Sequence, residues 1–170
     1  VKGLKKRWRA ITAEDFEKVV MENEDFNIAR VKCLPELDLE FSDTDIPRPG
    51  HVSIIVVPRS EQAPSDELIN DVAEFLDERR LITCRHHVVK PEYTDASIRA
   101  DVVAISQVEK ANLQERIIEN LKRFFHPLKG GPGSEQQGWP FGRDIYASEV
   151  YEVIEGTEGV EHVESLTLCT

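Results

Sequence analysis

Hydrophobic and polar residues alternate along the start of the chain in a pattern that predicts a helix and then a strand. Thr12 begins the helix, because its hydroxyl can accept a hydrogen bond from the amide of Asp15 while the Asp15 carboxylate binds back. The helix has one apolar face, made by Phe16, Val19 and Val20. Ile28–Leu34 then alternates apolar and basic residues, which predicts a half-buried strand.

Two more strands and a second helix are predicted before residue 91. His51–Pro58 is almost entirely apolar and β-branched, as in a central strand. Ser65 caps a helix that runs to Arg79 and Arg80, and Ile82–Lys90 predicts the third strand. The acidic segment Pro35–Gly50 joins the first two strands. In this segment acidic residues alternate with three apolar ones, so we expect a short exposed hairpin arm carrying Leu37, Leu39 and Phe41.

The second half of the chain repeats this mixture of strands and helices. A long amphipathic strand covers Ala96–Ala104, and a helix follows whose apolar face holds Leu113, Ile117, Leu121 and Phe124. Pro127 stops this helix, and the glycine-rich segment Leu128–Gly142 predicts a loop. Ser148 is expected to cap a short helix that ends at Gly156, and Val163–Leu168 predicts the last strand.

These elements predict an α+β fold with two small tandem modules, each a mixed or antiparallel sheet with helices packed on one face. Residues 1–91 form the first module, in the order helix–strand–strand–helix–strand. Residues 92–170 form the second, in the order strand–helix–loop–helix–strand. Pro91–Tyr93 is the expected hinge, because the strands on either side each complete a separate apolar pattern.

Composition and charge exclude several classes of protein. The chain has 170 residues, of which 40% are hydrophobic and 31% charged, as in a soluble globular protein. A formal net charge of −11 disfavours nucleic acid as a partner, and no apolar run is long enough to predict a membrane span. The basic start Lys2–Arg9 is interpreted as a frayed terminus rather than a signal peptide or a site for an acidic partner. The first residue is Val1, which suggests a piece of a longer protein.

Cysteine and histidine residues give no clear metal site. Cys33, Cys84 and Cys169 are odd in number and widely spaced, which indicates reduced, packed thiols of a cytosolic protein. Cys84 and His86 share one face of their strand and His87 points away, so at most two local ligands converge where zinc needs three or four. We therefore expect no metal and no other cofactor.

No arrangement of residues predicts catalysis. Six glutamates recur at every third position and indicate a solvated helix face rather than a buried acid–base pair: Glu149, Glu152, Glu155, Glu158, Glu161 and Glu164. No G-x-S-x-G elbow surrounds Ser60, Ser65 or Ser148, and Lys129–Ser134 lacks the order of residues of a phosphate loop. The sequence thus predicts neither an enzyme nor a small-molecule substrate.

The loop Gly138–Asp144 is the candidate interaction site. It carries two large aromatic residues, Trp139 and Phe141, and the cationic Arg143. Tryptophan and arginine are common anchors of protein interfaces, but aromatic residues in such a loop can equally plug the loop onto its own module. Both interpretations stay open from the sequence.

Several segments resemble a known family. RAITAEDFEKVV, IARVKCLP, PGHVSIIVVP and ELINDVAEFLDERRLIT occur in this order, followed by GWPFGRDIYASEVYEVIEGTEGVEHVESLTL. Together they resemble the C-terminal part of baseplate assembly proteins of the baseplate J-like family, which belong to contractile phage tails and phage-tail-like injection particles. The resemblance runs from Arg9 to Leu168, and the block from Gly138 to Tyr151 is its most specific part. The segment Pro35–Pro49 is longer than the usual turn there.

The resemblance implies a structural role. It implies a wedge component that is made in the cytoplasm and incorporated into a baseplate, where it binds other copies of itself and other wedge or hub proteins. The family implies no catalytic residues for this region. The rival interpretation is a pair of ferredoxin-like modules that sense a small molecule or act as a regulatory binding module, which a deep pocket between modules would favour. A hydrolase is a third class, for which the acid–base pair is missing.

Overall fold

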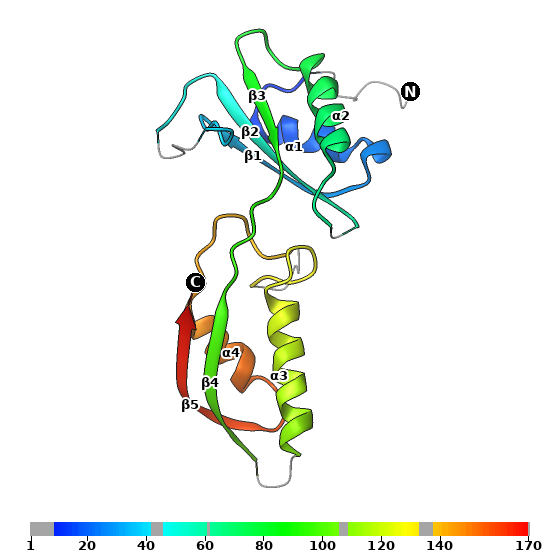
Figure 1. Cartoon of the computed structure of the whole chain (residues 1–170). Coiled ribbons are helices and arrows are strands. Elements are labelled where there is room, and N and C mark those ends of the chain that lie inside the picture. Colours follow the sequence, from blue (N-terminus) through cyan, green and yellow to red (C-terminus); the bar gives the residue numbers. More distant parts are fainter. Residues whose placement is uncertain (1–8, 42–45, 61, 106–108, 133–137, 170) are drawn as a thin grey trace, which may run out of the picture. The chain divides into compact units, whose positions relative to one another are not determined.

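The computed structural model describes residues 9–41, 46–60, 62–105, 109–132 and 138–169. The chain divides into two compact units, Val1–Glu92 and Tyr93–Thr170, each with its own sheet and its own helices (Figure 1). This arrangement confirms the predicted α+β class. Of the sequence-based expectations, the basic start lies outside the described residues apart from Arg9, as does the end of the segment Lys129–Ser134. No described helix is long and apolar enough to span a membrane.

The first unit is a three-stranded sheet with two helices. Its elements are α1 (Ala13–Met21), a short 3-10 helix (Glu24–Phe26), β1 (Ile28–Pro35), β2 (His51–Pro58), α2 (Asp66–Asp77) and β3 (Arg85–Val89). The strand order is β1-β2-β3, with β1 antiparallel to β2. β3 is parallel to β2 because α2 makes the crossover between them. The predicted order of elements is confirmed.

One face of this sheet and the two helices enclose the core of the unit. The register places Cys33, Ile54 and Val88 side by side across the three strands, and all three are buried. Two helix side chains, Phe16 of α1 and Leu76 of α2, are buried in the same cluster. Side chains alternate between the two faces of a strand, so the neighbouring row, Leu34, Ser53 and His87, lies on the opposite face.

The ends of the helices test the predicted caps. Thr12 Oγ1 accepts from the Asp15 amide at 3.2 Å and the Thr12 amide donates to Asp15 Oδ2 at 3.1 Å, which confirms the capping box. Ser65 likewise caps α2 by accepting from the Leu68 amide. The expectation for Ser148 is wrong. Tyr146 occupies the N-cap position of the last helix with extended backbone, and Ser148 lies inside the first turn.

The third predicted strand is shorter than expected. Residues 82–84 form a turn in which the Cys84 amide donates to the Leu81 carbonyl at 3.0 Å, and Ile82 is 97% exposed. The strand begins only at Arg85, because its pairing partner β2 begins at His51, directly opposite Arg85. The apolar side chain of Ile82 is therefore not sufficient to extend the strand when no partner strand lies beside it.

The second unit is a two-stranded sheet with two helices. Its elements are β4 (Ser97–Ala104), α3 (Lys110–Phe124), α4 (Ala147–Glu155) and β5 (Val160–Cys169), and β4 is antiparallel to β5 along its whole length. The order of elements is as predicted. The buried apolar side chains of its core cluster are few among the described residues: Leu113, Val150, Ile154 and Val160. Asn120 of α3 donates to Thr157 Oγ1 at 2.9 Å, which ties α3 to the residue that follows α4.

Candidate functional site

The loop with the three candidate interaction residues is fixed against the C-terminal end of α3. The amide of Trp139 donates to the carbonyl of His126 at 3.0 Å. Gly131 has a φ of 101°, and a Cβ atom there would lie 2.6 Å from the carbonyl oxygen of Gly138. Only glycine fits so close an approach, so this part of the loop is tightly closed.

The indole of Trp139 packs within its own unit. Its ring centroid lies 5.5 Å from that of Phe124 and 4.9 Å from that of Phe125, at the end of α3. Its Nε1 donates to the carbonyl of Arg143 at 3.4 Å. The side chain is half-buried by these contacts. Trp139 therefore packs over the end of α3.

Arg143 is also engaged within the unit. Its guanidinium forms an ion pair with Glu149 in the first turn of α4, where a negative charge also favours the helix. Its Cζ lies 5.4 Å from the centroid of the Trp139 ring. Phe141 is half-buried. The sequence analysis assigned Glu149 to a solvated helix face. That assignment is wrong, because Glu149 is half-buried in this ion pair.

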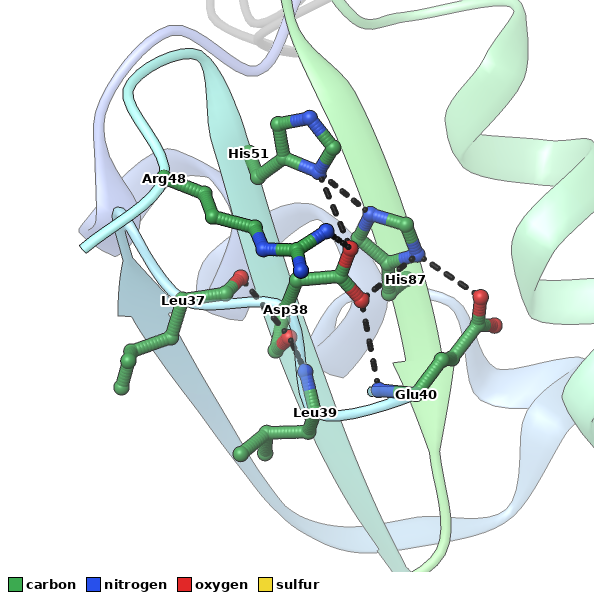
Figure 2. A network of polar contacts seen from close by, with 8 residues as sticks. Leu37, Asp38, Leu39, Glu40, Arg48, His51 and His87 are labelled. Carbon is green, nitrogen blue, oxygen red and sulfur yellow. Dashed lines mark hydrogen bonds and ion pairs between the residues drawn. The ribbon is translucent and has the colours of Figure 1, made fainter. Parts of the chain in front are cut away.

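A second polar arrangement, which sequence reasoning missed, lies on the face of the first sheet opposite α1 and α2. Figure 2 shows five side chains that converge there: Asp38, Glu40, Arg48, His51 and His87. Nδ1 of His51 lies 2.9 Å from Nε2 of His87 and 3.3 Å from Oδ2 of Asp38. The two imidazole rings are stacked with centroids 5.1 Å apart. We call Asp38, His51 and His87 the His–Asp cluster.

The connection between β1 and β2 brings Asp38 onto this face. Ser53 of β2 donates to the carbonyl of Leu37 and accepts from the amide of Leu39, both at 3.0 Å. These two bonds press Asp38 against the sheet, where it is 3% exposed, whereas Phe41 is 54% exposed. The expected exposed hairpin arm is therefore wrong for residues 36–41. Acidic and apolar residues do alternate in this segment, but the residue that faces the sheet is the acidic Asp38.

Charges around the cluster balance the buried carboxylate. Nη1 of Arg48 lies 3.3 Å from Asp38 Oδ2, and the same guanidinium lies 4.1 Å above the ring of Phe41. Nδ1 of His87 lies 2.9 Å from Oε2 of Glu40. The amide of Glu40 donates to Asp38 Oδ1 at 3.3 Å. A buried carboxylate needs such partners, because an unpaired charge away from water is strongly unfavourable.

The sequence indicated that Cys84, His86 and His87 do not all converge on one point, and the structure agrees. Nε2 of His86 lies 3.0 Å from the carbonyl of Ala73 on α2, on the helix face of the sheet. Burial lowers the pKa of His86 and raises the pKa of Cys84. His87 points to the other face, where its partners come from outside the trio. The sequence-based argument against a metal thus considered a set of residues that the fold separates.

The cysteines are free thiols. Burial, with a contribution from the carboxylate of Glu17, raises the pKa of Cys33 to about 12. Such a thiol stays protonated and behaves as a small apolar side chain. Cys169 is exposed, so the expectation that all three thiols are packed is wrong for this residue.

A groove of about 650 Å³ lies within the second unit, between β4 and α3. Its lining is mostly apolar, with Lys110 and Gln114 as polar exceptions among these residues: Ile98, Ala100, Val102, Val103, Ala104, Leu113, Ile117, Ile118, Leu121 and Ile154. A small-molecule site usually combines an apolar wall with several convergent polar groups. The groove has no such set of polar groups among its lining residues, and it lies inside one unit.

Comparison with known proteins gives a likeness among solved structures. No protein-family model matches the sequence. No curated protein matches it either. Among solved structures, the chain is similar to a chain of the anti-feeding prophage (AFP) baseplate, determined by cryo-electron microscopy with 6-fold symmetry, with a TM-score of 0.70 and 19% sequence identity. The match covers 96% of this chain and 34% of that chain, so this chain has the fold of about one third of an anti-feeding prophage baseplate protein.

Proposed function

We propose that the chain is a structural part of a contractile-tail baseplate, from a phage or a phage-tail-like injection particle, and that it acts in the assembly of the baseplate wedge by binding other subunits. The observation that carries this proposal is the likeness to the baseplate chain, which extends over 96% of the residues and therefore over both units. It agrees with the family resemblance of the sequence segments.

The chemistry of the chain supports a binding role rather than catalysis. The residues on the loop Gly138–Asp144 are used to hold the loop in one shape, and a rigid loop loses little conformational entropy when a partner binds to it. The groove between β4 and α3 adds an open apolar surface of the kind that protein partners cover. A net charge of −11 further favours protein partners over nucleic acid.

The test is to locate the protein in particles. The protein is expressed with an affinity tag in its native host, sheathed particles are isolated by sedimentation, and the tag is labelled with gold for negative-stain electron microscopy. We expect the label at one end of each particle, at the baseplate. An untagged strain is the control for non-specific gold, and purified particles without label would contradict the proposal.

The small-molecule interpretation receives no specific support. It would require a pocket with several polar groups pointed at one ligand, and the groove between β4 and α3 is lined mainly by aliphatic side chains. We therefore develop only the assembly role.

A further inference from the structure

We propose that the His–Asp cluster, made by Asp38, His51 and His87, is a binding site for a divalent transition-metal ion of the zinc class. The site lies in the first unit, and its function is separate from the assembly role proposed above. It would join three segments that are distant in sequence: the β1–β2 connection, the start of β2, and β3.

The donor atoms lie close enough together to bind one ion. Nδ1 of His51 lies 2.9 Å from Nε2 of His87 and 3.3 Å from Oδ2 of Asp38, and one donor atom from each residue lies within 4.8 Å of the others. Zinc binds nitrogen and oxygen at about 2.0–2.1 Å, so neighbouring donors in a tetrahedral shell are about 3.3 Å apart. The two spacings to His51 Nδ1 are close to this value, and the spacing between His87 and Asp38, which is within 4.8 Å, shortens toward it when an ion binds.

The hydrogen bonds outside the donor set leave the required lone pair on His87. Nδ1 of His87 lies 2.9 Å from Oε2 of Glu40, and a neutral imidazole must donate its proton in that contact. Nε2 of the same ring then carries a lone pair directed at His51. A histidine that binds metal through one nitrogen and a carboxylate through the other is the usual arrangement in zinc sites.

His51 completes the site by a change of tautomer. With no ion bound, the proton on His51 Nδ1 serves the contact with His87 Nε2. When the proton is on Nε2 instead, Nδ1 of His51, which lies 3.3 Å from Asp38 Oδ2, and Nε2 of His87 both have a lone pair available for an ion. The two ring nitrogens, 2.9 Å apart, would otherwise be limited to a single shared proton.

Charge and burial suit a divalent cation. With neutral imidazoles, the two carboxylates of Asp38 and Glu40 outweigh the one guanidinium of Arg48 by one negative charge. Arg48 opposes the ion, but it also holds the Asp38 carboxylate in place. The Asp38 side chain is 2% exposed, whereas those of His51 and His87 are 20% and 14% exposed, so an ion can reach a site that is already ordered.

The donor types select the kind of ion. Two imidazoles and one carboxylate suit zinc, cobalt, nickel or copper, whereas magnesium and calcium prefer oxygen donors alone. Three protein donors leave at least one position for water. We therefore expect Zn²⁺ and Co²⁺ to bind and millimolar Mg²⁺ not to compete.

The test is a titration of the full chain with Zn²⁺ by calorimetry, and with Co²⁺ by its visible absorption. We expect one ion per chain, with His51→Gln and His87→Gln each weakening binding at least tenfold. Glu40→Gln, at an exposed position that should not affect folding, should weaken it about 10–100-fold, as loss of a partner to a ligating histidine does. Circular dichroism verifies the fold of every variant.

Two histidines serve as matched controls. His86→Gln changes the neighbouring residue of the same strand, which faces the helices, and His162→Gln changes an exposed histidine of the second unit. Both should bind Zn²⁺ as the unmodified chain does. The proposal is overturned if the unmodified chain does not bind Zn²⁺ stoichiometrically, or if His51→Gln and His87→Gln bind it as well as the controls. Either result would mean that the cluster only fastens the β1–β2 connection to the sheet.

Discussion

At the scale of single residues, the sequence alone does not decide the role of Trp139. A tryptophan between glycine and proline in a loop is equally compatible with a plug and with an exposed anchor. In the structure the ring contacts Phe124 and Phe125 at the end of α3, so we expect it to act as a plug there. Because the ring is half-buried rather than fully buried, its removal should cost less than removal of a core tryptophan.

We predict that Trp139→Ala lowers the free energy of unfolding of the second unit by about 2–3 kcal/mol, since the ring leaves a gap between the loop and the end of α3. Trp139→Phe is the matched variant. It keeps an aromatic ring on Phe124 and Phe125 and loses the contact of Nε1 with the Arg143 carbonyl, so it should cost about 1 kcal/mol. Urea denaturation followed by circular dichroism measures both. A loss below about 0.5 kcal/mol for Trp139→Ala, together with failure to enter particles, would instead favour the interface.

At the scale of elements, the helix ends separate a correct cap from an incorrect one. Thr12 and Ser148 are both hydroxyl residues at the start of an amphipathic segment, and the sequence predicts a cap for each. In the structure the Thr12 hydroxyl accepts from the Asp15 amide, whereas Ser148 lies one residue inside α4. The difference has a measurable consequence.

We predict that Thr12→Ala destabilises the first unit by about 1 kcal/mol, because it removes the hydrogen bond to the Asp15 amide and leaves that donor unsatisfied. Ser148→Ala should change the stability of the second unit by less than about 0.5 kcal/mol, since alanine is a better residue inside a helix than serine. Chemical denaturation of both variants measures the difference. Equal losses for the two variants would contradict the N-cap of α4 seen here.

At the scale of the whole molecule, the chain is built from two units with unequal cores. The first unit buries side chains from both helices and all three strands. The second has four buried apolar side chains in its core cluster, among its described residues, and a two-stranded sheet. Three or more strands, or a packed helix, are needed for a small sheet to be stable alone, so the second unit depends on α3 and α4.

We predict that the fragments Val1–Glu92 and Tyr93–Thr170 each fold when expressed separately, and that the second melts at a lower temperature. The reason is that each fragment retains a complete sheet with its helices, while the second has fewer buried apolar side chains. Thermal unfolding by circular dichroism compares each fragment with the whole chain. If either fragment lacks a cooperative transition that the whole chain shows, the units are not independent.

The sequence by itself determined the elements whose signals are local. Several features follow from contacts between residues a few positions apart. They are the capping box at Thr12, the cap at Ser65, the apolar strand His51–Pro58 and the order of elements in both halves. Hydrophobic periodicity and helix capping act over this range, so they can be predicted from the sequence alone. The start of the third strand was predicted wrongly, because the length of a strand depends on its partner strand, which here starts at His51.

Only the tertiary structure decided the sites. The His–Asp cluster joins residues up to 49 positions apart, from Asp38 to His87, and depends on the parallel register of β2 and β3, which places His51 and His87 on one face. The inward turn of Asp38 is set by two hydrogen bonds of the Ser53 hydroxyl, one donated to the Leu37 carbonyl and one accepted from the Leu39 amide, in a segment whose alternation favoured the opposite orientation. The partner of Arg143 was likewise fixed by the position of α4. Side-chain convergence depends on how strands pair and loops fold back, and neither is encoded in a local pattern.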